Sequence, residues 1–213
     1  MSKLPGLVII GAGGFGREMV AWARQSVQFR RDWVLKGLID DNPNALIGKN
    51  CALPLLGSVR DHEPKEDEVF ICALGVPAIK RKCTELLLTR GARFTQVIHQ
   101  TAVLGDNVEL GAGVVMCPFS VASANNRLGR GVVLNLHASV DHDANVDDWS
   151  QVNCHCDLTA GVEIGKEVFL GSSVAIIPGV RVGDGAYVGA GAVVLRDVPP
   201  GAKVFGVPAR RKE

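Results

Sequence analysis

The sequence has few aromatic residues, almost no net charge and no long hydrophobic run. Aromatic residues make up 5% of the 213, and 23 Lys and Arg offset 22 Asp and Glu, which leaves a formal net charge of +1. A chain without a basic excess argues against general nucleic-acid binding. No apolar run approaches the roughly 18 residues of a membrane span, and the first residues lack the pattern of a signal peptide.

The cysteines are too scattered for a disulfide framework. Together with the missing signal peptide, this predicts a reducing, cytoplasmic setting for a protein that binds neither membranes nor nucleic acid. The six cysteines are Cys51, Cys72, Cys83, Cys117, Cys154 and Cys156.

Residues 97–198 repeat every six residues without an insertion. Stepping by six from Ile98 gives seventeen positions, of which fifteen are Ile, Leu or Val. A second set, four residues further on in each repeat, is small or aliphatic except at Asn126. Six residues are not a whole number of helix turns, whereas short strands joined by turns at this period form a β-helix. The pattern therefore predicts triangular coils of about 18 residues whose stacking buries an apolar column.

A third set of positions directly follows each large aliphatic residue and is rich in Gly, Asn and Asp. Because these residue types tolerate positive φ, we expect the left-handed corner residues of the coils to lie at these positions. The set comprises Gly105, Gly111, Gly129, Gly165, Gly171, Gly183 and Gly189, with Asn135, Asp141, Asp147 and Asn153.

Residues 1–95 have the pattern of a small α/β domain, and residues 96–213 form the solenoid domain with a C-terminal tail. Apolar runs predict strands at residues 7–10, 33–39 and 69–74. Helices are expected at residues 17–25 and 77–89, the second with Pro near its start and Gly just past its end.

The turn after the first strand reads G-A-G-G-F-G at residues 11–16 and leads into a helix. A glycine-rich turn at a helix N-terminus can bind phosphate. Asp40 lies 24 residues after Gly16, near the acidic position of a dinucleotide fingerprint. A dinucleotide needs two mononucleotide-binding halves, and this domain has room for one, which favours a single nucleotide over NAD. A simple tight turn is the alternative.

Four features together resemble the bacterial nucleotide-sugar acetyltransferases of the left-handed β-helix superfamily. They are the six-residue repeat, G-A-G-G-F-G-R-E at residues 11–18, N-L-H-A-S-V-D-H-D at 135–143 and V-F-G-V-P-A-R at 204–210. The resemblance includes amino-sugar N-acetyltransferases and sialic acid O-acetyltransferases. It implies an α/β, Rossmann-like half-domain followed by a left-handed parallel β-helix. It also implies acetyl-CoA as cosubstrate and a homotrimer with active sites between neighbouring solenoids.

The function that this resemblance implies is acetyl-CoA-dependent N-acetylation of a nucleotide-linked 4-amino-4,6-dideoxy sugar, for bacterial surface glycan synthesis. Two alternatives remain open at this point. One is an O-acetyltransferase of a sialic acid or another glycan hydroxyl. The other is a non-catalytic solenoid that binds nucleotide sugars.

The resemblance implies that His142 corresponds to the family's catalytic histidine and Asp143 to the acid that supports it. Histidine suits a general base because its ordinary pKa is close to the operating pH, and a carboxylate on one ring nitrogen raises the basicity of the other. An exposed histidine without a role is the alternative. Asp141, in the third set of positions, is expected to be a turn residue.

The resemblance also assigns binding residues. Asn135 would contact the substrate or only form a corner, and Gln151 replaces a histidine that relatives often use toward acetyl-CoA, so it can donate a hydrogen bond but cannot titrate. The predicted substrate-binding residues are Gly13, Gly14, Phe15, Asp40, Asp41, Gly75 and Asn135. The predicted acetyl-CoA contacts are Gln151, Ala160, Gly161 and Ala190, with Lys203, Arg210 and Arg211 as candidates for the CoA phosphates.

His137 and His155 are 18 residues apart, so one should stack on the other in successive coils. A metal site with the neighbouring Cys154 and Cys156 is not expected, because alternate residues of a strand point to opposite sides. We expect the two histidines to pack between subunits.

Overall fold

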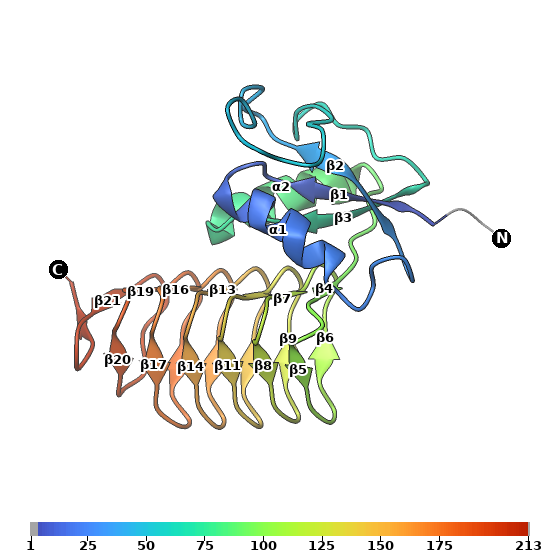
Figure 1. The fold of residues 1–213 in the computed structure, drawn as a ribbon. Helices are drawn as coiled ribbons and strands as arrows, with labels where there is room; N and C mark the ends of the chain where they lie inside the picture. Colours follow the sequence, from blue (N-terminus) through green and yellow to red (C-terminus); the bar gives the residue numbers. More distant parts are fainter. Residues whose placement is uncertain (1–3, 213) are drawn as a thin grey trace. The chain divides into compact units, whose positions relative to one another are not determined.

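The computed structural model describes residues 4–212 and divides into two compact units, Met1–Gln100 and Thr101–Glu213 (Figure 1). The outermost ends of the two predicted domains, residues 1–3 and 213, lie outside the described residues. The sequence suggests a domain boundary between residues 95 and 96, a few residues before the boundary between the compact units.

Residues 98–100 belong to the first unit because the segment after its first helix binds them. Gln28 Oε1 accepts a hydrogen bond of 3.0 Å from Ile98 N, and Gln25 Oε1 lies 2.7 Å from His99 Nε2. Strand β4 (Val97–Ile98) is therefore the last element of this unit.

The first unit is built on a parallel three-stranded sheet in the order β2-β1-β3. The central strand β1 (Gly6–Ile10) is buried along its whole length. It pairs with β2 (Val34–Ile39) and β3 (Glu68–Cys72). The three predicted strands are confirmed, with ends that differ by two residues or fewer.

Both predicted helices are present. Helix α2 (Pro77–Thr89) has the predicted bounds, and Gly91 follows it with a φ of +84°. Helix α1 (Gly14–Arg24) begins three residues before the predicted start, because the glycine turn itself enters the helix. A Cβ on Gly16 would lie 1.9 Å from the Gly11 carbonyl oxygen, so only glycine allows this close approach of helix and strand.

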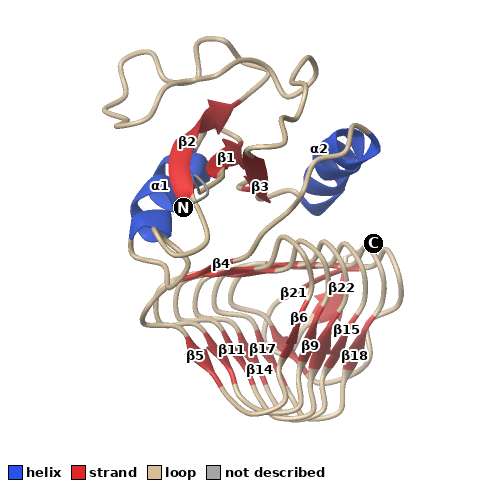
Figure 2. Ribbon diagram, turned by 90° about the vertical axis from the view of Figure 1, so that its right-hand side faces the viewer, coloured by secondary structure: helices blue, strands red, loops and turns tan. Residues whose placement is uncertain are grey.

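The second unit is a three-sided parallel β-solenoid, and each coil adds a short strand to each face (Figures 1 and 2). Face 1 contains β7 (Val115–Met116), β10 (Val133–Leu134), β13 (Gln151–Val152), β16 (Phe169–Leu170), β19 (Tyr187–Val188), β21 (Lys203–Phe205) and β22 (Arg210–Arg211). Face 2 contains β5 (Val103–Leu104), β8 (Val121–Ala122), β11 (Ser139–Val140), β14 (Asp157–Leu158), β17 (Ala175–Ile176) and β20 (Val193–Val194). Face 3 contains β6 (Glu109–Leu110), β9 (Arg127–Leu128), β12 (Asn145–Val146), β15 (Glu163–Ile164) and β18 (Arg181–Val182).

The two apolar sets of the repeat form the solenoid core, as predicted. From Met116 to Val194 every residue of the large aliphatic set is at most 2% exposed. In the second set even the polar Asn126 is inside, where its Nδ2 donates to the carbonyls of Asp141 and Ala144. The first strands of the solenoid are less well covered, and there Leu104 is 41% exposed and Leu110 half-buried.

The predicted positions of the left-handed corner residues are wrong by two residues. Ala138 N donates to Asn135 O (3.0 Å), which closes a turn whose third residue, His137, has a φ of 57°. Positive φ at the third residue is the geometry of a type II turn. The observed set is Asn107, Gly113, Phe119, Asn125, Gly131, His137, Asp143, Trp149, His155, Gly161, Glu167, Ser173, Gly179, Gly185 and Gly191.

The glycines of the predicted corner set instead allow the backbones of neighbouring coils to lie in close contact. A Cβ on Gly105 would lie 1.4 Å from Ser123 O in the next coil, and one on Gly171 would lie 2.5 Å from Ala190 N. The backbone itself blocks any side chain at these positions. Close stacking, rather than an unusual φ, therefore requires these glycines.

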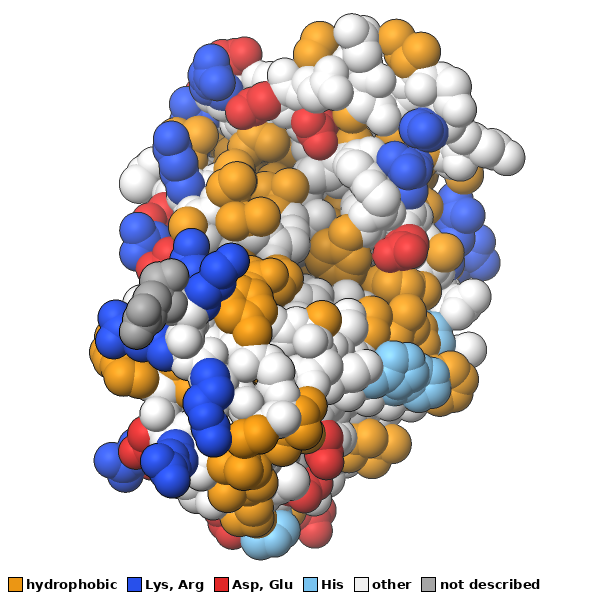
Figure 3. All heavy atoms as spheres, turned by 90° about the vertical axis from the view of Figure 1, so that its left-hand side faces the viewer, with side chains coloured by type: hydrophobic (Ala, Val, Ile, Leu, Met, Phe, Trp, Pro, Cys, Tyr) orange, Lys and Arg blue, Asp and Glu red, His pale blue; other side chains and the backbone are white. Residues whose placement is uncertain are grey.

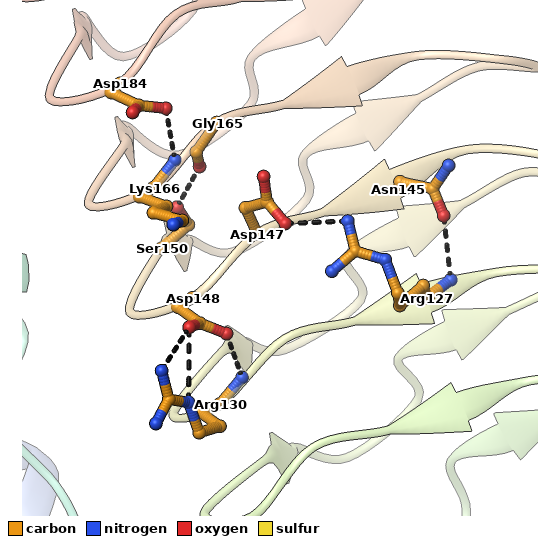
Figure 4. Close-up of polar contacts among 9 residues, drawn as sticks. All are labelled: Arg127, Arg130, Asn145, Asp147, Asp148, Ser150, Gly165, Lys166 and Asp184. Carbon is orange, nitrogen blue, oxygen red and sulfur yellow. Dashed lines mark hydrogen bonds and ion pairs between the residues drawn. The ribbon is translucent and has the colours of Figure 1, made fainter.

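Aspartates at one corner use the room that such glycines leave (Figure 4). Asp148 Oδ1 accepts a hydrogen bond of 2.7 Å from Arg130 N, and Asp184 Oδ1 accepts one of 2.8 Å from Lys166 N. Each bond joins residues 18 apart, and so ties one coil to the next.

Gly171→Ala is therefore expected to destabilise the protein more than Gly179→Ala. The first substitution places a methyl group against backbone of the next coil and should lower the free energy of unfolding by about 2–3 kcal/mol. Gly179 has a φ of +72° with open space around a Cβ, so its loss is about 1 kcal/mol. Urea unfolding at equal protein concentration measures both. Equal losses would contradict the role given to close stacking.

The solenoid ends in a hairpin in which β21 pairs with β19 in parallel and with β22 in antiparallel fashion. The hairpin covers the end of face 1, where an open strand edge would otherwise invite pairing with other chains.

In residues 4–212, α1 and α2 are both too short and polar to cross a membrane.

Candidate active site

The predicted catalytic pair lies on the turn that joins face 2 to face 3. His142 and Asp143 are the second and third residues of the turn after β11, and Asp143 takes the positive φ of 60°. Ala144 N lies 3.4 Å from Asp141 O, so Asp141 opens this turn, in line with its expected role as a turn residue. The turn holds both side chains of the pair outside the solenoid.

The two side chains are hydrogen-bonded to each other. His142 Nδ1 lies 2.8 Å from Asp143 Oδ2, and the side chains are 62% and 59% exposed. The bonds from His142 and from Asn125 hold the pKa of the Asp143 carboxyl below its ordinary value. Asp143 is thus ionised near neutral pH and orients the ring so that Nε2 faces away from it.

Asn125 is a member of the site that sequence reasoning missed. Its Nδ2 donates to Asp143 Oδ1 (3.1 Å), and its Oδ1 accepts from Asn107 Nδ2 (3.1 Å). The three side chains form a ladder with steps of 18 residues. Applying the coil period to Asp143 would have identified it.

The predicted acetyl-CoA contacts fall into two groups. Ala160 and Gly161 lie one coil beyond His142 and Asp143 on the same corner, and Gly161 N donates to His142 O (3.0 Å). Ala190 lies on the turn between faces 1 and 2, and Gln151 lies on β13 of face 1. Within one chain the solenoid does not bring the second group to His142.

Asn135 and Gln151 are held by neighbours near the corner between faces 1 and 2. Asn135 Oδ1 accepts a hydrogen bond of 2.8 Å from Leu136 N, which is the local corner role considered for it. Gln151 is only 1% exposed, and its Nε2 lies 3.3 Å from Asn153 Oδ1. A direct contact of Gln151 with acetyl-CoA stays a prediction.

The predicted stacking of His137 on His155 is confirmed. Their ring centroids are 5.0 Å apart with planes at 6°, and Phe119 stacks on His137 at 5.0 Å and 14°. Cys156 points inward and is buried, and burial raises the pKa of its thiol to about 11. No cluster of three or more His, Cys, Asp or Glu in residues 4–212 could hold a metal ion.

In the first unit, the predicted nucleotide-binding residues follow the carboxyl ends of neighbouring strands. The chain passes from β1 to β2 on one side and to β3 on the other, so the strand order reverses between β1 and β3. Open α/β sheets bind ligands at such a switch point. The turn with Gly13, Gly14 and Phe15 follows β1, and Gly75 follows β3.

The N-terminus of α1 suits an anion. Its N-cap is Gly13, without a side-chain hydrogen bond, and its first turn contains Arg17 and no acidic residue. The free N–H groups and the positive end of the helix dipole would therefore face a phosphate at the exposed Gly13 and Gly14.

Both aspartates after β2 already have structural partners. Asp40 Oδ2 accepts a hydrogen bond of 2.7 Å from Ala12 N and Oδ1 one of 2.9 Å from Asn42 N. Asp41 Oδ1 accepts from Arg60 N (3.0 Å). Asp40 thus fixes the glycine turn, and ligand contacts of these carboxylates stay predictions.

A separate cavity of about 560 Å³ is lined by Lys36 of β2, by Glu68 of β3 and by residues of the segment between these strands. Glu68 in its wall is bonded to Lys36 (2.8 Å) and His62 (2.9 Å). Burial favours the neutral acid, but these two bonds hold the pKa of Glu68 below its ordinary value. We interpret this cluster as structural because its charges satisfy one another.

Basic side chains gather at the C-terminal end of the solenoid (Figure 3). Lys203, Arg210 and Arg211 are exposed there, and Lys203 and Lys212 line a cavity of about 520 Å³ beside Tyr187. The assignment of these residues to the CoA phosphates stays a prediction.

Asp143→Asn is expected to lower kcat/KM by about 10- to 100-fold, because the amide cannot stabilise a protonated His142 as a carboxylate does. Asparagine tolerates positive φ, so the turn should be preserved. Asn125→Ala removes only one neutral bond to Asp143 and should have a smaller effect. Steady-state kinetics of both variants provide the measurement, and a larger loss from Asn125→Ala would contradict the assigned roles.

Two family matches cover separate parts of the chain. Residues 6–87 match the PglD N-terminal domain, and residues 161–196 match the bacterial transferase hexapeptide (six repeats). GDP-perosamine N-acetyltransferase of Escherichia coli O157:H7 is 29% identical over 177 residues, which cover 79% of this chain and 76% of that protein.

Solved structures of similar proteins match the full architecture. The acetyltransferase domain of PglB from Neisseria gonorrhoeae, solved in complex with acetyl coenzyme A, has a TM-score of 0.89 and 28% identity over 99% of this chain and 100% of that one. A histidine-to-asparagine mutant of perosamine N-acetyltransferase from Caulobacter crescentus, in complex with CoA and GDP-perosamine, has a TM-score of 0.87 and 27% identity, covering 99% and 98%. With its six-residue repeat and its PglD-type first unit, the chain belongs to the hexapeptide-repeat acetyltransferases of the left-handed β-helix superfamily.

Proposed function

We propose that this protein transfers the acetyl group of acetyl-CoA to the amine of a nucleotide-linked 4-amino-4,6-dideoxy sugar. The observation that carries the proposal is the His142–Asp143 pair, joined at 2.8 Å on an exposed corner of the solenoid. The similar proteins named for GDP-perosamine N-acetylation support both the donor and the class of acceptor.

In this proposal His142 is the general base. With Nδ1–H donated to Asp143, the lone pair of Nε2 is free to accept a proton. The sugar amine attacks the thioester carbonyl carbon, and its proton passes to Nε2 as the C–N bond forms. The C–S bond then breaks, and the proton from Nε2 is returned to the departing CoA sulfur.

The developing oxyanion needs a hydrogen-bond donor. The Gly161 N–H is already donated to the His142 carbonyl, and the Ala160 carbonyl accepts from Gly179 N (3.0 Å). We assign the Ala160 N–H to the oxyanion, because Ala160 lies one coil beyond His142 on the same corner.

The nucleotide is assigned to the first unit. The N–H groups of the Gly13–Gly14 turn and the N-terminus of α1 would bind its phosphates. Asp40 and Asp41 would bind the base or the ribose at the remaining lone pairs of their carboxylates.

The acetyl-CoA site is assigned to a groove between two copies of a homotrimer. His142 is 62% exposed in a single chain, and Ala190 and Gln151 lie away from its corner, so a complete site needs a second chain. The trimer would work in the cytoplasm, where the six free thiols of each chain stay reduced.

The test is release of free thiol from acetyl-CoA with GDP-linked 4-amino-4,6-dideoxymannose as acceptor. The proposal expects release with this acceptor and none with the matched 4-hydroxy sugar. Release with a sialic acid or with the hydroxyl sugar alone would indicate O-acetylation instead. No release with any nucleotide-linked amino sugar, whether the nucleotide is UDP, dTDP or GDP, would overturn the proposal.

A further inference from the structure

The corner between faces 1 and 2 presents a column of three stacked rings. Phe119, His137 and His155 are each 18 residues apart, and both centroid separations are 5.0 Å. All three side chains are exposed, Phe119 to 53%. Because the ring faces are stacked on one another, the column presents the edges of the imidazoles, which contain the ring nitrogens.

The backbone at these three residues disfavours large side chains. Their φ values are 61°, 57° and 59°, in the left-handed region where glycine is the usual residue. On this corner the chain uses glycine at Gly191, and at the equivalent turn position of the His142 corner it uses Gly161 and Gly179. Rings held at an unfavourable φ and also exposed to solvent suggest a role other than stability of the single chain.

The corner that carries His142 and the corner that carries the rings bound the same face. Face 2 lies between them, and its outer side chains are small, among them Val121, Ser139 and Ala175. If three copies turn face 2 toward a common threefold axis, the His142 corner of each copy meets the ring corner of the next. Such a head-to-tail contact closes after three copies.

The heights of these residues along the solenoid also agree. A threefold axis parallel to the solenoids adds no shift along that axis, so residues at equal height meet. Successive coils rise by about 4.8 Å per 18 residues. His137 therefore lies about 1.3 Å below the level of His142, and His155 about 3.5 Å above it. The two imidazoles bracket the height of the base.

We propose that His137 and His155 of one copy form the opposite wall of the acetyl-transfer site built on His142 of its neighbour. Their ring nitrogens would hydrogen-bond the acetyl donor or the sugar there. This inference rests on the proposed function and adds two binding residues to it, both from the second chain. The exposed carboxylate of Asp143 and the half-buried one of Asp141 make the facing corner acidic, which complements imidazole N–H donors.

The test is complementation between two inactive variants. One is His142→Ala, and the other is the double variant His137→Gly/His155→Gly. Glycine suits the backbone at both positions, so the double variant should fold. In any mixed trimer, one of three sites combines an intact His142 with an intact ring pair. The two variants, co-expressed at equal levels with different tags, should therefore recover about a quarter of wild-type kcat, against a loss of at least tenfold in each variant alone.

If the kcat of the co-expressed variants is no greater than the average of the separate variants, the inference is overturned. That result would mean that the rings and His142 of one chain belong to the same site. Full activity of the double variant would also overturn it. Ser173→Gly is the matched control, since Ser173 occupies the same turn position with a φ of 60° but lies about 8 Å above His142. Absence of acetyl transfer by the wild-type protein would count against the proposed function instead.

Discussion

Replacing His142 by alanine should reduce kcat by about a hundred- to ten-thousand-fold, the range expected when a general base is removed. The reason is that Nε2, turned outward by the 2.8 Å bond between Nδ1 and Asp143, is the group assigned to take the amine proton. His142→Asn should lose as much, because an amide cannot accept that proton. Steady-state kinetics with the 4-amino nucleotide sugar measure the loss.

The same variants should still bind both substrates. The nucleotide is assigned to the first unit and most of the CoA contacts to other residues, so dissociation constants for CoA and for the nucleotide sugar should change by less than about tenfold. Asp106→Ala is a matched control, since Asp106 lies on the same corner two coils away, and it should retain wild-type kcat. Near-normal turnover of His142→Ala would exclude the base role.

The second large effect is a pH dependence of protein stability that arises from Lys80. This residue of α2 is fully buried, and desolvation lowers the pKa of its ammonium group to about 7. The neighbouring Cys72 thiol is buried as well, and burial raises its pKa to about 11, so it supplies no charge at neutral pH. Between pH 7 and the ordinary lysine pKa of about 10.5, the unfolded chain holds a proton that the folded chain lacks.

The direction in which stability changes with pH follows from that difference in bound protons. Stability rises with pH wherever the unfolded state binds more protons, so lowering the pH from 9 to 7 should destabilise the protein through Lys80 by about 2 kcal/mol. Below pH 7 the folded protein is protonated too, and the effect ends. In Lys80→Met this contribution is absent.

The measurement is urea unfolding of wild type and Lys80→Met at pH 7 and pH 9, at one protein concentration. The difference between the two pH values should be about 2 kcal/mol larger in the wild type. Equal pH dependence of the two proteins would show that Lys80 is charged in the folded state.

The fold could be predicted from the sequence because its main signal is long and regular. The large aliphatic set starting at Ile98 keeps its phase over seventeen positions, and each position from Met116 on is buried as the period requires. Helix α2 was predictable to the residue, because Pro77 and Gly91 mark its two ends.

The corner geometry could not be predicted, since glycine has two uses. Gly105 and Gly171 are required by the backbone of the next coil, and their φ values are ordinary. The residues that do take positive φ include Phe119 and His137, whose types give no sign of it. Only the distances between coils separate these two roles.

The candidate site was predictable in its local part and not in its wider surroundings. His142 and Asp143 are neighbours in the sequence, so a motif suffices to find them. Asn125 supports Asp143 from the previous coil, and the period rather than the motif identifies it. Gln151 and Ala190 lie on other parts of the solenoid, and only the proposed trimer would bring them to His142 from a second chain.

The most direct measurement is a crystal structure of the His142→Ala variant with CoA and a GDP-linked 4-amino sugar. The account predicts the sugar amine between the CoA sulfur and residue 142, within about 4 Å of the space vacated by the imidazole. An amine bound away from this corner, or CoA bound at a different face of the solenoid, would contradict it.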